Sequence, residues 1–201
     1  MRRGLKRIGN RMQAECFYAS PAWKVVLDLI DVRRPVFEVI VLHGTLIASK
    51  ALSGARQVRH LQPDFQFLYE ASLLHDIGIF LTNAPNIDCH GKAPYLQHGI
   101  LGAGLLRKAG LPRHARVCES HVGVCISKKE IIEKKLALPK KDYFPKTLEE
   151  KLIAWADKFY SKIPGKFLEE KSVETITAGL SKFGTDKAAI FLEWQHMFGG
   201  S

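Results

Sequence analysis

The chain has 201 residues, of which 46% are hydrophobic and 25% are charged, and its formal net charge is +10 at pH 7. This length allows one ordinary domain with a substantial core, and the hydrophobic content excludes a disordered chain. The positive charge favours an anionic partner: a nucleotide, a phosphate ester or a nucleic acid. Because the basic residues are dispersed, without an RNP-like aromatic signature or a glycine-rich P-loop, we expect a small phosphate compound rather than nucleic acid.

The N-terminal segment is basic and lacks the apolar run of a secretory signal. We expect residues 1–20 to form a basic arm or a short surface helix ahead of a helical domain at 21–201. No apolar stretch is expected to reach the roughly 18–20 residues of a membrane span, so no membrane partner is predicted. The four cysteines form no C-x-x-C pair, which predicts reduced thiols in a cytoplasmic protein. They are Cys16, Cys89, Cys118 and Cys125.

Helical patterning dominates the first half of this domain. A proline opens an apolar helical stripe at 35–54, and a Pro-Asp pair opens a second helix at 63–78. The segment 82–91 is rich in Asn, Pro, Asp and Gly and predicts a loop. Further prolines open helices at 94–110 and 112–121, the first of which ends at a glycine suited to a C-cap.

The second half is also helical. Capping boxes of the form Ser/Thr-x-x-Glu at 127–130 and 147–150 predict helix starts, the second for a helix that runs on to a proline at 164. Two more segments with helical patterning follow at 168–183 and 186–198. No strand alternation of any length competes with these signals. We predict an all-α fold, a single-domain helical bundle of roughly seven to nine helices.

The stretch LLHDIGIF places His75 and Asp76 inside an apolar run. Burying a charge is costly unless something compensates it. On a regular helix these neighbours point about 100° apart, but a last turn that loosens before Gly78 lets both side chains reach one point between helices. A metal ion at that point would pair the carboxylate and take the imidazole as a neutral ligand. The pair therefore predicts a metal site completed by side chains of other helices.

Two candidate partners lie on flanking helices. His43 lies among apolar residues of the 35–54 helix, and Asp157 lies on the interior-looking side of the helix that starts after 147. The alternative reading of Asp157 is a surface aspartate paired with Lys158 or Lys162.

Two further candidates, His98 and His121, lie on the helices in between. Two alternatives stay open: His90 could replace His98, and His114, on the same helix face as His121, could replace His121. We prefer His98 because it begins a helix, and we expect His114 to face solvent in the first turn after a proline. The helix after His98 carries three glycines that close packing or a close-approaching ligand would explain: Gly99, Gly102 and Gly104.

In chain order, His43, then His75 and Asp76, then Asp157 resemble the H…HD…D motif of the HD-domain superfamily of metal-dependent phosphohydrolases. The letters HDIG match one form of that motif fully. The resemblance covers about residues 36–162 and implies an HD core there, followed by C-terminal helices at 165–198. His98 and His121 resemble two extra histidines of the branches that bind two metals. Those branches include cyclic-dinucleotide phosphodiesterases and bacterial diadenosine-tetraphosphate hydrolases. The G-Y-P motif of the dedicated cyclic-dinucleotide enzymes is missing, since the chain reads IFLTNAP after HDIG.

The resemblance implies a set of metal ligands. A first metal would be held by His43, His75, Asp76 and Asp157, and Asp76 would bridge to a second metal ligated also by His98 and His121. It implies one or two divalent ions, iron or manganese, with nickel, cobalt, zinc or magnesium as alternatives. A metal lowers the pKa of a bound water, which then supplies the nucleophile for phosphate hydrolysis.

A phosphate substrate also needs cations beside the metals. Lys158 directly follows Asp157 and ranks first, with a catalytic role beside Asp76; a solvated lysine is the alternative. Other basic residues rank lower: Lys50, Arg56, Arg59 and Lys92. The loop 82–91 is a candidate lid or specificity wall.

The complete ligand set favours an enzyme. We expect a metal-dependent phosphohydrolase or phosphodiesterase that uses a metal-activated water to hydrolyse a phosphate ester or anhydride of a nucleotide-type substrate. The alternative is a non-catalytic signalling module that binds a nucleotide on the HD scaffold, for which broken ligands would be expected.

Overall fold

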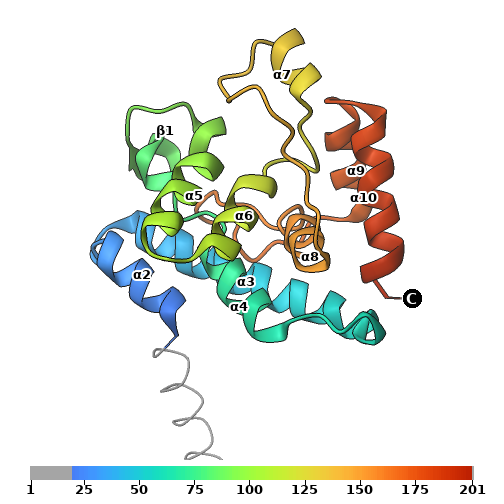
Figure 1. The fold of residues 1–201 in the computed structure, drawn as a ribbon, viewed down its shortest axis with the longest axis horizontal. Coiled ribbons are helices and arrows are strands. Elements are labelled where there is room, and N and C mark those ends of the chain that lie inside the picture. The colour runs from blue at the N-terminus through green and yellow to red at the C-terminus, as the bar shows by residue number, and fades with distance from the viewer. Residues whose placement is uncertain (1–19, 201) are drawn as a thin grey trace, which may run out of the picture.

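The computed structural model describes residues 20–200, and the predicted arm at 1–20 lies outside the described residues except for Ser20. The described part contains nine α-helices and one short hairpin, which confirms the all-α prediction (Figure 1). The helices are α2 (Pro21–Leu29), α3 (Pro35–Gln57), α4 (Phe65–Leu74), α5 (His98–Lys108), α6 (Pro112–Ser120), α7 (Lys128–Glu133), α8 (Leu148–Ala156), α9 (Val173–Ser181) and α10 (Thr185–Phe198). The hairpin pairs β1 (Asn83–Ala84) antiparallel with β2 (Cys89–His90) inside the predicted loop. The division into an arm and one domain stays a prediction.

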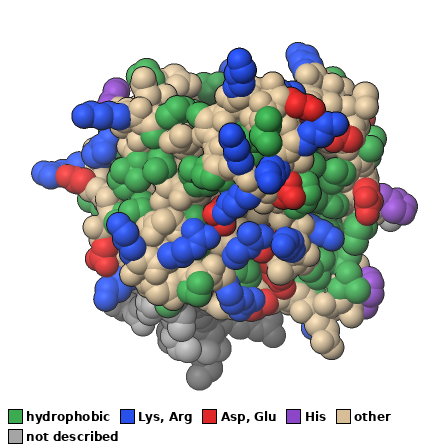
Figure 2. Space-filling model, turned by 45° about the horizontal axis from the view of Figure 1, so that its top comes forward, with side chains coloured by type: hydrophobic (Ala, Val, Ile, Leu, Met, Phe, Trp, Pro, Cys, Tyr) green, Lys and Arg blue, Asp and Glu red, His purple; other side chains and the backbone are tan. Residues whose placement is uncertain are grey.

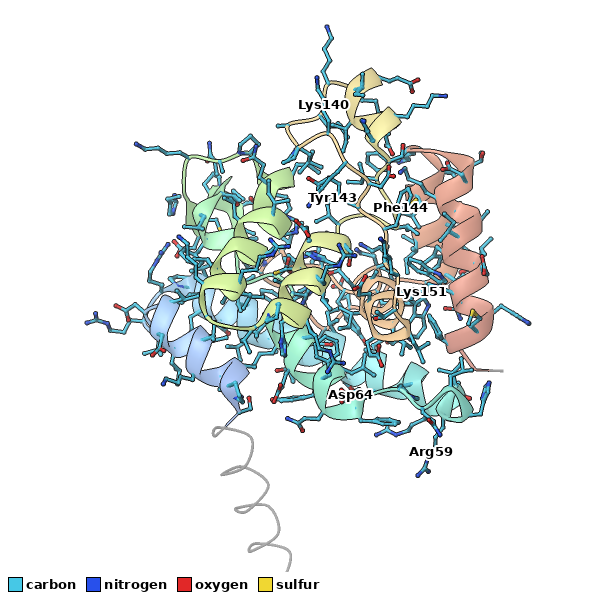
Figure 3. All side chains as sticks on the ribbon, in the orientation of Figure 1. Arg59, Asp64, Lys140, Tyr143, Phe144 and Lys151 are labelled. Atoms are coloured by element: carbon cyan, nitrogen blue, oxygen red, sulfur yellow. The ribbon has the colours of Figure 1, made fainter. Side chains whose placement is uncertain are left out.

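Helix starts follow the local sequence signals. Pro35 and Pro112 occupy the first positions of α3 and α6. Asp64, at the start of α4 (Figure 3), accepts a hydrogen bond from the backbone N–H three residues later at 3.0 Å. Ser127 and Thr147 do the same for α7 and α8, at 3.0 and 3.2 Å. These side chains satisfy N–H groups that a helix start leaves without partners.

Helix ends differ from the predictions. α3 continues past Gly54, because this glycine lies inside the helix against Trp155, where a Cβ would come within 2.9 Å of the ring. α7 has only six residues and is followed by Lys135 at φ +50°. α8 ends at Ala156 instead of running on to 164. The early end of α8 frees residues 157–164 to turn back toward the core.

α3 is the central helix of the fold (Figure 1). It packs against α4, and also against α8 and α10. One cluster of buried apolar side chains includes Ile47 of α3, Trp155 of α8 and Phe191 of α10. A second cluster includes Ile40 of α3 and Leu74 of α4. Because α3 contributes to both clusters, it joins the two parts of the core.

α3 is also the one helix within residues 20–200 that is long and apolar enough to cross a membrane by length and composition alone. No such stretch was expected. The helix buries ten of its residues inside the protein, among them His43. Such burial is typical of the core helix of a globular domain, so the length of α3 does not support a membrane span.

The three cysteines among the described residues are free, as the prediction of reduced thiols requires: Cys89, Cys118 and Cys125. Cys16 lies outside the described residues. The thiol of Cys118 is buried and donates to the carbonyl oxygen of His75 at 2.9 Å. This contact ties α6 to the turn that follows α4.

Glycines allow α5 to approach its neighbours closely. A Cβ on Gly99 would lie 2.5 Å from the carbonyl oxygen of Cys118, and one on Gly102 would lie 2.7 Å from the sulfur of that cysteine. Gly78 also approaches Gly102: a Cβ on Gly78 would lie 2.4 Å from the backbone nitrogen of Gly102. Gly104 has open space around it. Close packing therefore explains two of the three glycines in α5 and fixes its N-terminal end.

Candidate metal centre

Six buried side chains from five helices and their ends meet at one point. They are His43, His75, Asp76, His98, His121 and Asp157, with relative exposures between 0% and 8%. His75, His121 and Asp157 are the C-cap residues of α4, α6 and α8, and His98 opens α5. Only His43 lies in the middle of a helix. The predicted helix at 63–78 ends at Leu74, and this early end lets His75 and Asp76 point to one place.

The first group consists of His43, His75, Asp76 and Asp157, whose ligand atoms all lie within 4.8 Å of one another. Nε2 of His43 lies 3.0 Å from Oδ1 of Asp157 and 3.5 Å from Oδ2 of Asp76. Nε2 of His75 lies 3.2 Å from Oδ2 of Asp76 and 3.4 Å from Oδ1 of Asp157. Two imidazoles and two carboxylates thus surround one position.

The second group consists of Asp76, His98 and His121. Oδ1 of Asp76 lies 3.3 Å from Nε2 of His98 and 3.4 Å from Nε2 of His121. The two Nε2 atoms lie 3.0 Å apart. Asp76 therefore presents one carboxylate oxygen to each group, which is the arrangement that the resemblance implied for a bridging ligand.

Backbone carbonyls orient three of the imidazoles. Nδ1 of His75 lies 2.6 Å from the carbonyl oxygen of Ser72, Nδ1 of His98 lies 2.7 Å from that of Tyr95, and Nδ1 of His121 lies 2.8 Å from that of Cys118. A carbonyl can only accept, so each Nδ1 carries the hydrogen. In the neutral ring, Nε2 then keeps a lone pair that faces the cluster, as in metal-binding histidines.

The residues fit a metal ion. Within residues 20–200, Nε2 of His75 and Oδ1 of Asp76 are buried and have no hydrogen-bond partner. The Nε2 atoms of His98 and His121 would repel each other at 3.0 Å if both held lone pairs. A cation beside these atoms removes both costs, and imidazole with carboxylate is a donor set suited to divalent transition ions.

Electrostatics separates the histidines. Burial, aided by nearby Lys162, lowers the pKa of His43 to about 4, and burial lowers the pKa of His98 to about 3. Burial acts in the same direction on His75, but the Asp76 and Asp157 carboxylates outweigh it and raise its pKa to about 9. Burial alone would raise the pKa values of both carboxyls, yet neighbouring lysines and histidines hold them well below the usual range. Asp76 and Asp157 are therefore both ionised at neutral pH.

Two lysines reach this centre. Lys158, the predicted cation, has its Nζ 2.8 Å from Oδ2 of Asp157. Lys162 contacts both carboxylates, with Nζ 2.9 Å from Oδ2 of Asp76 and 3.4 Å from Oδ1 of Asp157. Burial opposes its charge, but the two carboxylates hold the pKa of Lys162 well above its usual value. Asp157 is therefore paired with both lysines, but as a buried residue and not as the surface aspartate of the alternative reading.

A cavity of about 570 Å³ opens beside the two lysines. Asn83 and Asn86 of the loop after HDIG line it, together with Tyr95 and Lys171. The ring of Tyr95 packs against His98 with 4.8 Å between ring centroids. The cavity thus reaches the cluster at Asp157, behind a basic and polar wall. We call it the lysine cavity.

The lower-ranked cations lie elsewhere and do not line the lysine cavity. Lys50 pairs with Glu170 at 2.5 Å and lies over the Phe159 ring. Figure 3 shows Arg59 pointing away from the body of the protein, on the side opposite Lys140. Basic side chains are interspersed with acidic and apolar ones on the face in Figure 2, which agrees with the predicted dispersal of charge.

The structure decides between the alternative histidines. His90 is exposed and lies 3.2 Å from Asp88, away from the cluster. His114 was expected to face solvent, and this prediction is wrong. Its ring is buried edge-on against Phe67, and its Nε2 lies 3.4 Å from Glu70, because the first turn of α6 packs on α4. His98 and His121 are the histidines that the fold brings to Asp76.

Lys162 is the main residue that the sequence reasoning missed as a site residue. A continuous helix would place Lys162 about 140° from Asp157, at about 100° per residue. The end of α8 at Ala156 removes that restriction. The proline at 164 shows only that the helix ends before it and does not mark the end at Ala156.

Comparisons with known proteins identify the family and the fold of this chain. The family model of the HD domain matches residues 43–161. An uncharacterized protein of Methanocaldococcus jannaschii is 37% identical over 123 residues, 60% of this chain and 65% of that protein. A protein named tRNA (cytidine(56)-2′-O)-methyltransferase from Picrophilus torridus is 41% identical over 125 residues, 62% of this chain and 32% of that protein. The match thus spans less than two thirds of each of these relatives.

A solved structure shows the same fold. The HD domain of the phosphodiesterase PgpH from L. monocytogenes aligns with 89% of this chain and 96% of its own, at a TM-score of 0.51 and 16% sequence identity.

Proposed function

This chain belongs to the HD-domain family of metal-dependent phosphohydrolases, and we propose that it hydrolyses a phosphate ester or anhydride of a nucleotide-type substrate with a metal-activated water. The observation that carries the proposal is one buried carboxylate, Asp76, shared by two groups of ligand atoms beside a lysine-lined cavity. A divalent metal supplies two things when bound: a water of lowered pKa and Lewis acidity toward phosphoryl oxygens.

We assign the ligand roles as the resemblance implies. His43, His75, Asp76 and Asp157 would hold the first ion, and Asp76, His98 and His121 would hold the second. Iron or manganese is the proposed metal, because imidazole and carboxylate together suit these ions. The carbonyl contacts of His75, His98 and His121 orient the rings before any ion arrives.

The lysine cavity is the proposed phosphate site. Lys158 and Lys162 lie within 2.8–3.4 Å of the carboxylates and line this cavity, which supports a role in neutralising the charge that develops on phosphoryl oxygens. The polar side chains of Asn83, Asn86 and Tyr95 face the same space and offer hydrogen bonds to further phosphate or sugar oxygens. A nucleotide-type substrate matches this combination of cationic and neutral polar groups.

The methyltransferase activity in the names of two relatives is not proposed for this chain. Those proteins are matched over only 32% of their length, so most of each lies outside the match.

The test combines metal analysis with a substrate panel. Purified protein is analysed for bound metals and then assayed with nucleoside mono-, di- and polyphosphates and cyclic nucleotides in Mn, Fe, Co and Mg. We expect bound metal and hydrolysis of at least one compound, both lost in Asp76→Ala. The matched control is Asp28→Ala, an exposed aspartate on α2.

The results also separate the alternatives. Unchanged hydrolysis in Asp76→Ala refutes the mechanism. Bound metal with tight nucleotide binding but no turnover identifies the non-catalytic binding module instead.

A further inference from the structure

A second cavity, of about 360 Å³, shares Lys158 with the lysine cavity. Ligand-binding cavities span about 300–1,000 Å³, so its size suits a small organic group. Its walls are apolar and come from four separate segments. They include Leu96, Val122, Ile126, Leu136, Leu180 and Phe183. We call it the apolar cavity.

The two cavities meet at Lys158, whose Nζ lies 2.8 Å from Oδ2 of Asp157. Lys158 lines both of them. Tyr95 lines the lysine cavity and the next residue, Leu96, lines the apolar cavity. Val122, a wall of the apolar cavity, directly follows His121 of the second ligand group. One elongated molecule could therefore extend past Lys158 with one end in each cavity.

The charges differ between the cavities. In the apolar cavity, Lys187 donates to Oε2 of Glu130 and to the carbonyl oxygen of Cys125, both at 2.6 Å. Lys134 donates to Oε1 of Glu130 at 2.9 Å. Lys134 and Lys187 are therefore both paired with one carboxylate, and Lys158 is the third cation of this wall. The lysine cavity instead gathers Lys158, Lys162 and Lys171. An anionic group is thus favoured in the lysine cavity and an uncharged apolar group in the other.

The walls of the apolar cavity are anchored. Leu96, Val122 and Leu136 pack against a small core of Ile126, Ile131 and Tyr143. This core lies between α5, α7 and the segment before α8. A preformed wall keeps its shape when a ligand enters, so less conformational freedom is lost on binding.

We propose that the apolar cavity binds the uncharged organic group of the substrate, a group of nucleobase size, while its phosphate lies between the ligand groups and the lysine cavity. This inference rests on the proposed phosphohydrolase function and adds to it a recognition element for the substrate. It makes the substrate a phosphate compound with an aromatic or apolar end, and it excludes a bare sugar phosphate as the preferred substrate.

The test fills the cavity. Leu180→Trp adds bulk from α9, and Leu136→Trp is the second variant in case the first misfolds; both residues are half-buried. The control is Ile132→Trp, which adds the same ring at a 50% exposed position of α7 outside this cavity. The probes are the four common nucleoside 5′-monophosphates, the four nucleosides without phosphate, and ribose 5-phosphate. Circular dichroism establishes that each variant is folded.

In the filled variants, we expect kcat/KM for the preferred nucleotide to fall at least about tenfold, while that for ribose 5-phosphate changes less than about twofold. The control variant should match the wild type with both. The matching nucleoside, measured by calorimetry with metal-free protein, should bind the wild type and the control but not the filled variants.

Failure of the inference differs from failure of the proposed function. If the protein hydrolyses nucleotides but both folded variants keep the wild-type selectivity and nucleoside affinity, the apolar cavity is not the recognition element. If the wild type hydrolyses none of the phosphates with any metal, the proposed function is wrong. Nucleoside binding then still tests whether the apolar cavity binds the organic group. If none of the four nucleosides binds the wild type, the inference is overturned.

Discussion

Gly78, the last letter of HDIG, offers a direct test of how the centre is held together. A Cβ at this position would lie 2.2 Å from the carbonyl oxygen of His98 and 2.4 Å from the nitrogen of Gly102. Both neighbours are backbone atoms of α5, which cannot rotate away as a side chain can. The change Gly78→Ala therefore forces α5 away from the turn after α4.

The size of the effect follows from these contacts. Ordinary contact of a Cβ begins near 3.4 Å, so the oxygen of His98 must retreat by more than about 1 Å. Overpacking of a close-packed interior costs about 1–3 kcal/mol, and a clash with backbone belongs at the upper end. About 3 kcal/mol lowers the melting temperature of a chain of this length by about 6–12 °C. The displacement also separates His98 from Asp76, so we expect weaker binding of the second ion.

Urea unfolding followed by circular dichroism measures the first effect, and calorimetric metal titration measures the second. The control is Gly104→Ala in the same helix, where a Cβ meets nothing within 4 Å. There, alanine should stabilise the protein by up to about 1 kcal/mol, because glycine is a poor helix former. The packing explanation is refuted if Gly78→Ala keeps the wild-type urea midpoint and metal stoichiometry, or if the two variants lose equal stability.

Three further outcomes are expected. His121→Ala should reduce the bound metal from two ions to one per chain in elemental analysis, and an unchanged stoichiometry would contradict the second ligand group. Lys162→Met removes the ammonium that pairs with Asp76, so the metal affinity measured by calorimetry should rise about tenfold. The value of kcat/KM should fall about 100-fold or more, because the same ammonium is proposed to bind phosphoryl oxygens. An unchanged metal affinity would show that the ammonium does not compete with the metal. Burial opposes ionisation of Glu130, but Lys187 and Lys134 outweigh it and lower its pKa below 4.5. Its stabilisation is therefore complete above pH 4.5 and is lost as the pH falls through the lower folded value, so Glu130→Gln should flatten the acid side of the stability curve.

Much of the site could be predicted because its signals are local. A histidine and an aspartate inside an apolar run indicate a buried charge that another group must compensate. The helix starts near them also carry clear capping residues. The structure brings His43, His98, His121 and Asp157 to that pair, as expected. Their role as ligands stays a proposal.

What the sequence did not show depends on distant segments. The burial of His114 arises from packing of α6 on α4, which local exposure signals do not contain. The position of Lys162 depends on the end of α8, which no glycine or proline marks at that point. The apolar cavity is formed by segments around Leu96, Leu136 and Leu180, which are far apart in the chain, so no spacing rule reveals it.

The carbonyl contacts of the imidazoles have a consequence for the energetics of loading. Each ring of His75, His98 and His121 is aligned by the carbonyl three residues before it, within its own turn. The ion therefore does not have to order the rings; it has to hold α4, α5 and α6 together. Metal binding should accordingly be linked to global unfolding, so chelation lowers the melting temperature of the whole protein, and each tenfold increase in free metal above Kd adds about 1.4 kcal/mol of stability per site.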